Sequence, residues 1–127
     1  MGPVDQQVDF LKKQKQYSNA ALEHRADGSA LVTISNFPVP PGWNKTSTTV
    51  LFVAPAGYPQ ARPDCFWADE DLRLANGGMP ANSAINTNYG GAAPKLWFSY
   101  HPSSWNANLD NLLIYARLIQ KRLTEAK

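Results

Sequence analysis

The sequence has very few of the residues that build thiol and imidazole chemistry. Its 127 residues include one cysteine, Cys65, and two histidines, His24 and His101. A single cysteine excludes an internal disulfide and any zinc site made of several cysteines. Neither histidine stands near a cluster of carboxylates along the chain, so we expect no metal site and no cofactor.

Long apolar runs and a strong charge of one sign are also missing. The sequence has no stretch of about eighteen apolar residues, and residues 1–7 lack the apolar run of a signal peptide. We therefore expect a cytoplasmic protein that does not bind membranes. The formal net charge of +2 is too small to indicate nucleic-acid binding. With 43% hydrophobic and 17% charged residues, the chain is expected to fold as a single domain over residues 1–127.

The first part of the chain predicts a helix followed by a β-meander. Val4, Val8 and Leu11 recur at helical spacing, which predicts an amphipathic helix over residues 5–16. Alternating or β-branched residues predict strands over residues 17–23, 30–37, 48–54 and 64–68. Asp27-Gly28 indicates a tight hairpin between the first two strands. Four strands in sequence order favour an antiparallel meander.

The second part predicts a long loop and a final helix. Residues 76–94 contain four glycines, two prolines and no usable periodicity. Residues 106–124 have a helical pattern with Asn106 as the expected N-cap, and the apolar face consists of Leu109, Leu112, Leu113, Ala116, Ile119 and Leu123. The expected class is α+β: an N-terminal helix, a four-stranded antiparallel meander, a long loop and a C-terminal helix packed on the sheet.

Two short segments resemble ubiquitin-conjugating enzymes. Residues 52–67, with the Tyr58-Pro59 turn, resemble the third strand, Tyr-Pro turn and fourth strand of that family. The segment that begins at Trp105 resembles the Trp-Ser-Pro-Ala-Leu segment before the long helix of the family. The similarity is closer to a trimmed prokaryotic branch, for which we expect a Pro-Asp-x-Phe-Trp strand, as in residues 63–67, and a Trp-x-Ser-x-His segment, as in residues 97–101.

The resemblance implies an acyl transferase of a bacterial ubiquitination-like pathway. Such a protein takes a ubiquitin-like protein from an activating enzyme onto a cysteine and passes it to a target protein, so these three proteins are the expected partners. In the family that cysteine lies shortly before the tryptophan that introduces the final helix. Trp105 corresponds to this tryptophan, so counting back from it places the expected cysteine near Trp97. No cysteine is there. His101-Pro102-Ser103 is similar to the His-Pro-Asn motif of the family, but it is displaced along the chain and its last residue differs.

Three hypotheses for the chemistry follow from the missing cysteine. Ser99 replaces it, with His101 as the base, because side chains two residues apart share a side of an extended segment. Alternatively Cys65 is a relocated nucleophile, although a free cysteine inside a strand is more often a small buried hydrophobe. The third hypothesis is a non-catalytic adaptor of the same fold that binds a ubiquitin-like protein or its activating enzyme.

A basic cluster near the N-terminus provides one further candidate site. Lys12, Lys13 and Lys15 lie at the end of the first predicted helix. The resemblance implies that this helix docks the activating enzyme through these lysines. The alternative is a basic face that is merely solvated.

Overall fold

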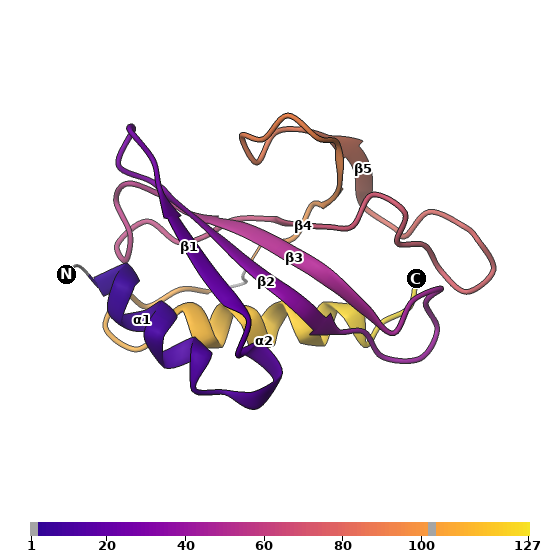
Figure 1. Cartoon of the computed structure of the whole chain (residues 1–127), viewed down its shortest axis with the longest axis horizontal. Coiled ribbons are helices and arrows are strands. Elements are labelled where there is room, and N and C mark those ends of the chain that lie inside the picture. The colour runs from indigo at the N-terminus through magenta and orange to yellow at the C-terminus, as the bar shows by residue number, and fades with distance from the viewer. Residues whose placement is uncertain (1–2, 102–103) are drawn as a thin grey trace.

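The fold was obtained as a computed structural model that describes residues 3–101 and 104–127 (Figure 1). Its elements, in chain order, are α1 (Pro3–Lys12), the 3-10 helix η1 (Lys15–Tyr17), β1 (Ala20–His24), β2 (Ala30–Pro38), β3 (Ser47–Ala54), β4 (Phe66–Ala68), β5 (Ser83–Asn86), β6 (Lys95–Phe98) and α2 (Leu112–Leu123). The predicted α+β class is confirmed. Within the described residues, no helix has both the length and the apolar content that crossing a membrane requires.

The strands form one antiparallel sheet in the order β1-β2-β3-β4-β6-β5. Its first four strands are the predicted meander, and the hairpin at Asp27-Gly28 is present with Gly28 at a φ of +88°. The prediction of an unstructured loop over residues 76–94 was wrong at β5, and the sequence pattern also missed β6. Both strands are four residues long, which is too short for periodicity to reveal them. Sheet pairing stabilises them, because β6 pairs with β4 and β5 pairs with β6.

The N-terminal helix is shorter than its pattern predicted. It ends at Lys12, and the next residues form η1. This turn buries Tyr17, whose ring stacks on Phe37 of β2 with 5.3 Å between the centroids. The first strand therefore begins at Ala20 and not at Tyr17, because the aromatic side chain is used for packing below the sheet.

The C-terminal helix begins later than predicted. Its N-cap is Asn111, whose side-chain oxygen accepts a hydrogen bond from the Ile114 amide at 2.9 Å. The predicted cap, Asn106, instead forms a separate turn in which its carbonyl accepts the Asp110 amide at 2.7 Å. Leu109 lies in that turn and is 75% exposed, so its predicted place on the apolar face was wrong.

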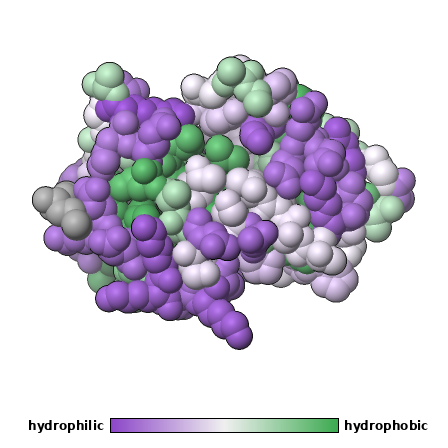
Figure 2. Space-filling model, viewed as in Figure 1, coloured by the Kyte–Doolittle hydropathy of each residue, from purple (hydrophilic) through white to green (hydrophobic). Residues whose placement is uncertain are grey.

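One face of the sheet is covered by α1 and α2, and Figure 1 shows both helices along the lower side of the strands. The main core lies between these layers, and its largest fully buried side chains include Tyr17, Tyr115, Phe37, Phe52, Phe66 and Phe98. A smaller cluster lies outside it and contains Leu31, Leu51, Trp67 and Tyr89. Figure 2 shows an apolar area over the strands on the face that it presents, bordered by hydrophilic residues.

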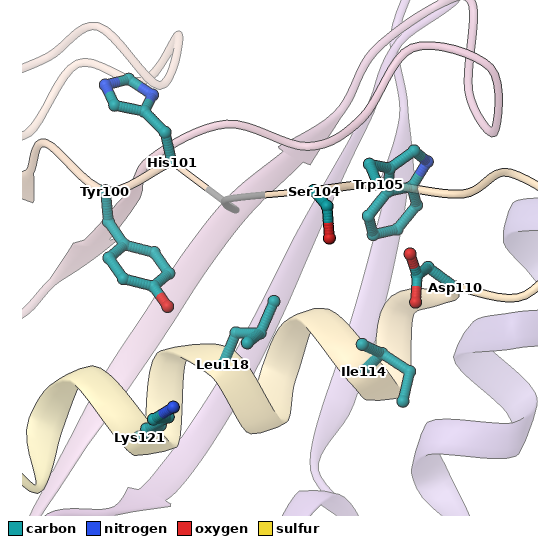
Figure 3. A pocket seen from close by; sticks show the side chains of 8 residues that line it. All are labelled: Tyr100, His101, Ser104, Trp105, Asp110, Ile114, Leu118 and Lys121. Atoms are coloured by element: carbon teal, nitrogen blue, oxygen red, sulfur yellow. The ribbon is translucent and has the colours of Figure 1, made fainter.

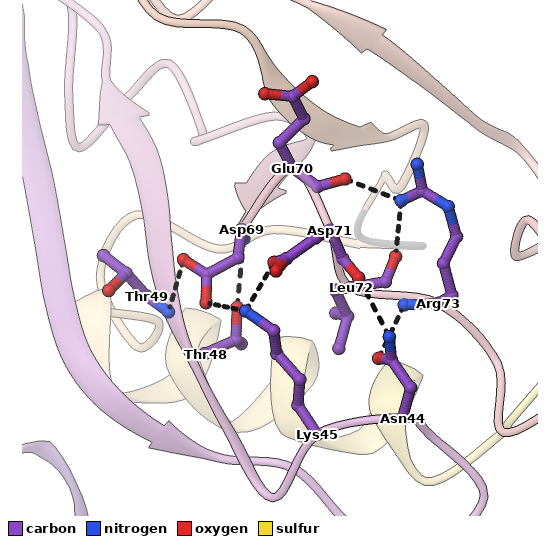
Figure 4. A network of polar contacts seen from close by, with 9 residues as sticks. All are labelled: Asn44, Lys45, Thr48, Thr49, Asp69, Glu70, Asp71, Leu72 and Arg73. Carbon is purple, nitrogen blue, oxygen red and sulfur yellow. Dashed lines mark hydrogen bonds and ion pairs between the residues drawn. The ribbon is translucent and has the colours of Figure 1, made fainter. Parts of the chain in front are cut away.

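A polar network joins the chain around the start of β3 to the turn after β4 (Figure 4). Lys45 forms ion pairs with Asp69, at 3.1 Å, and with Asp71. The Asp69 amide in turn donates to the buried hydroxyl of Thr48 at 3.0 Å. The segment before β3 and the turn after β4 are therefore tied together, which limits how far β4 can move.

These ion pairs predict a pH-dependent contribution to stability. The pKa of Asp71 is lowered, mainly by the hydrogen bond from Lys45, and the pKa of Lys45 is raised, mainly by the same bond. The carboxylate stabilises the fold until pH falls through its lowered pKa, and the ammonium does so until pH rises through its raised pKa. Both contributions are present between about pH 4 and pH 10.

Lys45→Met should therefore lower the free energy of unfolding most in this interval, with a difference from the wild type that shrinks toward about pH 2. Urea unfolding at a series of pH values measures this difference. Lys45→Arg keeps the charge and serves as the control that should follow the wild type. A difference that does not change with pH would show that it does not arise from these ion pairs.

Candidate functional site

Two chain segments meet where β4 begins and β6 ends. Phe66, the first residue of β4, pairs with Phe98, the last residue of β6. Beyond this pair the contact continues, because the Cys65 amide donates to the Tyr100 carbonyl at 2.8 Å. The residues that precede β4 and those that follow β6 therefore lie side by side.

The backbone at Cys65 is held in an uncommon conformation. Its φ of +61° lies in the left-handed region, which costs a non-glycine residue roughly 1 kcal/mol or more. The hydroxyl of Tyr115, from α2, donates to the Cys65 carbonyl at 2.5 Å. Burial raises the pKa of Tyr115, so its hydroxyl stays a protonated donor. This corner of the chain is thus fixed from the core side.

The corner brings a carboxylate, an imidazole and a hydroxyl into line. Asp64 Oδ1 contacts His101 Nδ1, and His101 Nε2 lies 3.5 Å from Ser99 Oγ. When Asp64 accepts the Nδ1 proton, the neutral imidazole keeps its lone pair on Nε2, which faces the serine. A base oriented in this way by a third group is the arrangement that activates a serine hydroxyl.

The four side chains differ in how accessible they are. The side chains of Asp64 and His101 are about half exposed, at 51% and 52%, and Ser99 is half-buried. Cys65 is only 8% exposed. Another protein can therefore reach the serine and histidine more easily than the thiol, which supports the buried-hydrophobe interpretation of Cys65. Pro102 and Ser103, which complete the altered His-Pro-Asn segment, lie outside the described residues.

A cavity of about 390 Å³ adjoins this site, between the loop after β6 and α2 (Figure 3). Figure 3 shows Tyr100 pointing toward the helix and His101 pointing away from it, so the imidazole stands at the rim. Trp105 fixes the far side of the loop, since its indole nitrogen donates to the Pro59 carbonyl at 2.8 Å. The Tyr58-Pro59 turn and the entry to the last helix are thereby joined.

Sequence reasoning paired Ser99 with His101 but missed Asp64. This residue is 37 positions from His101, and only the pairing of β4 with β6 brings the two together. The only local signal is the short apolar run Leu96-Trp97-Phe98, which is too short to identify β6 or its partner strand. The predicted docking residues Lys12, Lys13 and Lys15 are all exposed. They lie at the end of α1, in the following turn and at the start of η1, outside the Ser99 site.

The helix, the antiparallel sheet, the Tyr-Pro turn and the C-terminal helix define an E2-like protein, the class of the ubiquitin-conjugating enzymes. The family model described as Prokaryotic E2 family E matches residues 4–126, and the chain belongs to this family. The predicted resemblance to a prokaryotic ubiquitin-conjugating-like family is thus confirmed. No curated protein and no solved structure matches the chain.

Proposed function

We propose that the protein accepts a ubiquitin-like protein from an activating enzyme on Ser99 and transfers it to a target protein. Family membership supports the general class. The line from Asp64 through His101 to Ser99 is the observation that supports the serine. The intermediate would be an ester in place of the thioester that a cysteine forms.

In the first step, Ser99 Oγ attacks the thioester carbonyl that joins the ubiquitin-like protein to the activating enzyme. The new oxygen–carbon bond forms as the carbon–sulfur bond breaks. His101 Nε2 takes the serine proton and passes it to the leaving thiolate. Asp64 holds the imidazole and stabilises its positive charge while it carries the proton.

In the second step, an amine of the target attacks the ester carbonyl. The nitrogen–carbon bond forms, the carbon–oxygen bond breaks, and Ser99 Oγ regains a proton while the amine loses one. An ester carbonyl is less reactive than a thioester carbonyl, so the rate of this step depends more on general-base catalysis than it would with a cysteine. This need fits a histidine that carries its own carboxylate partner.

The alternative is a non-catalytic adaptor that binds the ubiquitin-like protein or its activating enzyme. The observation in its favour is the 3.5 Å between His101 Nε2 and Ser99 Oγ, which is long for a hydrogen bond. Catalytic hydrogen bonds are often loose before the substrate binds, so we prefer the enzyme hypothesis.

The test is to incubate the chain with the activating enzyme, the ubiquitin-like protein and ATP. A thiol-resistant adduct that base or hydroxylamine releases supports Ser99. An adduct that thiol releases supports Cys65, the second candidate nucleophile. Measurable binding without any adduct supports the adaptor.

We also propose that Lys12, Lys13 and Lys15 dock the activating enzyme. Phe10 lies on α1, the helix that ends at Lys12, and is 47% exposed. An exposed aromatic near cations suits a contact surface better than a solvated face. Reversing the three charges to glutamate should slow loading by roughly tenfold at low salt, with less effect at high salt.

Loading rates over a salt series measure this docking effect, and circular dichroism checks the fold. Lys127→Glu, a reversal at the other end of the chain, serves as the control. If the triple variant loads at the wild-type rate at low salt, the three lysines do not dock the activating enzyme.

A further inference from the structure

Asp64, Cys65 and His101 form a cluster of three different metal-ligating groups. Each offers one ligand atom, a carboxylate oxygen, a thiol sulfur and a ring nitrogen, and these atoms all lie within 4.8 Å of one another. The sequence alone argued against a metal site because no carboxylates stand near either histidine along the chain. The pairing of β4 with β6 supplies the missing carboxylate.

We propose that these three residues bind Zn²⁺ and that the bound ion switches off acyl transfer through Ser99. A mixed set of sulfur, nitrogen and oxygen ligands suits Zn²⁺ and is poorly suited to Mg²⁺ or Ca²⁺, which select oxygen ligands. Three protein ligands leave the fourth tetrahedral position to water. Metal binding itself does not depend on the proposed function, whereas the switching effect rests on it.

The geometry needs only a small adjustment to hold the ion. Zinc bonds of roughly 2.0–2.3 Å place tetrahedral ligand atoms roughly 3.3–3.8 Å apart. A spacing near the limit of 4.8 Å would close by about an ångström, whereas the contacting atoms of Asp64 and His101 would move apart to admit the ion. Asp64 and His101 are half exposed and have room to move toward the ion. Cys65 is the fixed member, because its amide and carbonyl are bonded to Tyr100 and Tyr115.

Metal binding and ester formation would use the same groups in incompatible ways. The ion binds the thiolate of Cys65 and releases its proton to solvent. It also takes the Asp64 carboxylate, which then no longer accepts the Nδ1 proton of His101. A ring nitrogen of His101 becomes a metal ligand, so the imidazole can no longer take the proton of Ser99. Zinc should therefore act as a reversible inhibitor of loading.

Untagged protein titrated with Co²⁺, a spectroscopic substitute for Zn²⁺, tests the binding directly. Cys65 is the only cysteine, so a thiolate-to-cobalt charge-transfer band in the wild-type protein identifies its ligand without any substitution. One equivalent of Zn²⁺ should abolish the band. A folded wild-type protein that shows no such band would overturn the proposal.

Variants then define the ligand set. We expect metal affinity to fall by at least roughly tenfold in each of Cys65→Ser, Asp64→Asn and His101→Gln. Mutating a residue that only hydrogen-bonds a metal ligand already lowers metal affinity by that factor. His24→Gln removes the other histidine and is the matched control that should bind as the wild type does. Unchanged affinity in both Asp64→Asn and His101→Gln would overturn the three-residue site.

The effect on function is measured as loading with and without Zn²⁺, followed by a chelator. Wild-type loading should fall with zinc and recover with the chelator, while Asp64→Asn should need at least roughly tenfold more zinc for the same fractional loss. Thioester formation on the activating enzyme in the same buffer is the control. A cobalt band without any loading would retain the metal site and refute the proposed function, whereas zinc-insensitive loading would refute the switch alone.

Discussion

Replacing Ser99 by alanine should remove the base-labile adduct with the ubiquitin-like protein. The substitution deletes the hydroxyl oxygen that forms the ester and leaves Asp64 and His101 in place. Loss of the nucleophile from a serine–histidine–carboxylate arrangement lowers the rate by roughly a thousandfold or more. Gel separation of the adduct, before and after treatment with hydroxylamine, measures the loss.

The substitution Ser99→Cys sharpens the same prediction. A thiol at this position should form a thioester, so the adduct should reappear and become sensitive to added thiol. Ser47→Ala, an exposed serine at the start of β3, is the control and should load normally. A wild-type adduct that persists in Ser99→Ala would place the nucleophile elsewhere, with Cys65 the next candidate.

The partners of Ser99 should show graded effects on the rate. His101→Gln removes the base and should slow loading by roughly 10²- to 10⁴-fold. Asp64→Asn leaves the imidazole in place without its carboxylate and should also slow loading, because the Nε2 lone pair is no longer held toward the serine. If both variants load at the wild-type rate, His101 is not the base.

The second large effect concerns the core that supports this site. Phe52 of β3 is fully buried, and its ring meets that of Tyr115 edge-on with 5.0 Å between the centroids. Phe52→Ala should lower the free energy of unfolding by about 3–5 kcal/mol, the usual cost of removing a buried phenylalanine. That is a large share of the roughly 5–15 kcal/mol that stabilises a typical domain.

Phe10→Ala is the matched control, because the same change is made at a residue that is 47% exposed. It should cost less than about 1 kcal/mol. Urea unfolding followed by fluorescence and by circular dichroism measures both variants. Equal losses would show that Phe52 does not lie in a closely packed core. Since Tyr115 also holds the Cys65 carbonyl, looser packing at Phe52 should disturb the site as well.

Local patterns were enough to predict the first four strands of the sheet and the existence of both helices. The Asp27-Gly28 hairpin followed from backbone preferences that act over a few residues. The ends of the helices did not follow from their patterns, because more than one residue could serve as the cap. Asn106 and Asn111 are equally good caps by type, and the packing of Leu112 against the core selected the second.

The sequence by itself determined the class of fold, the family resemblance and the pairing of Ser99 with His101, since each depends on residues close together along the chain. Only the tertiary structure decided that Asp64 and Cys65 join them. That meeting depends on the register of β4 against β6, in which the paired residues lie 28 to 32 positions apart along the chain. Neither strand is long enough for its sequence pattern to specify the register, so the packing of the whole sheet sets it.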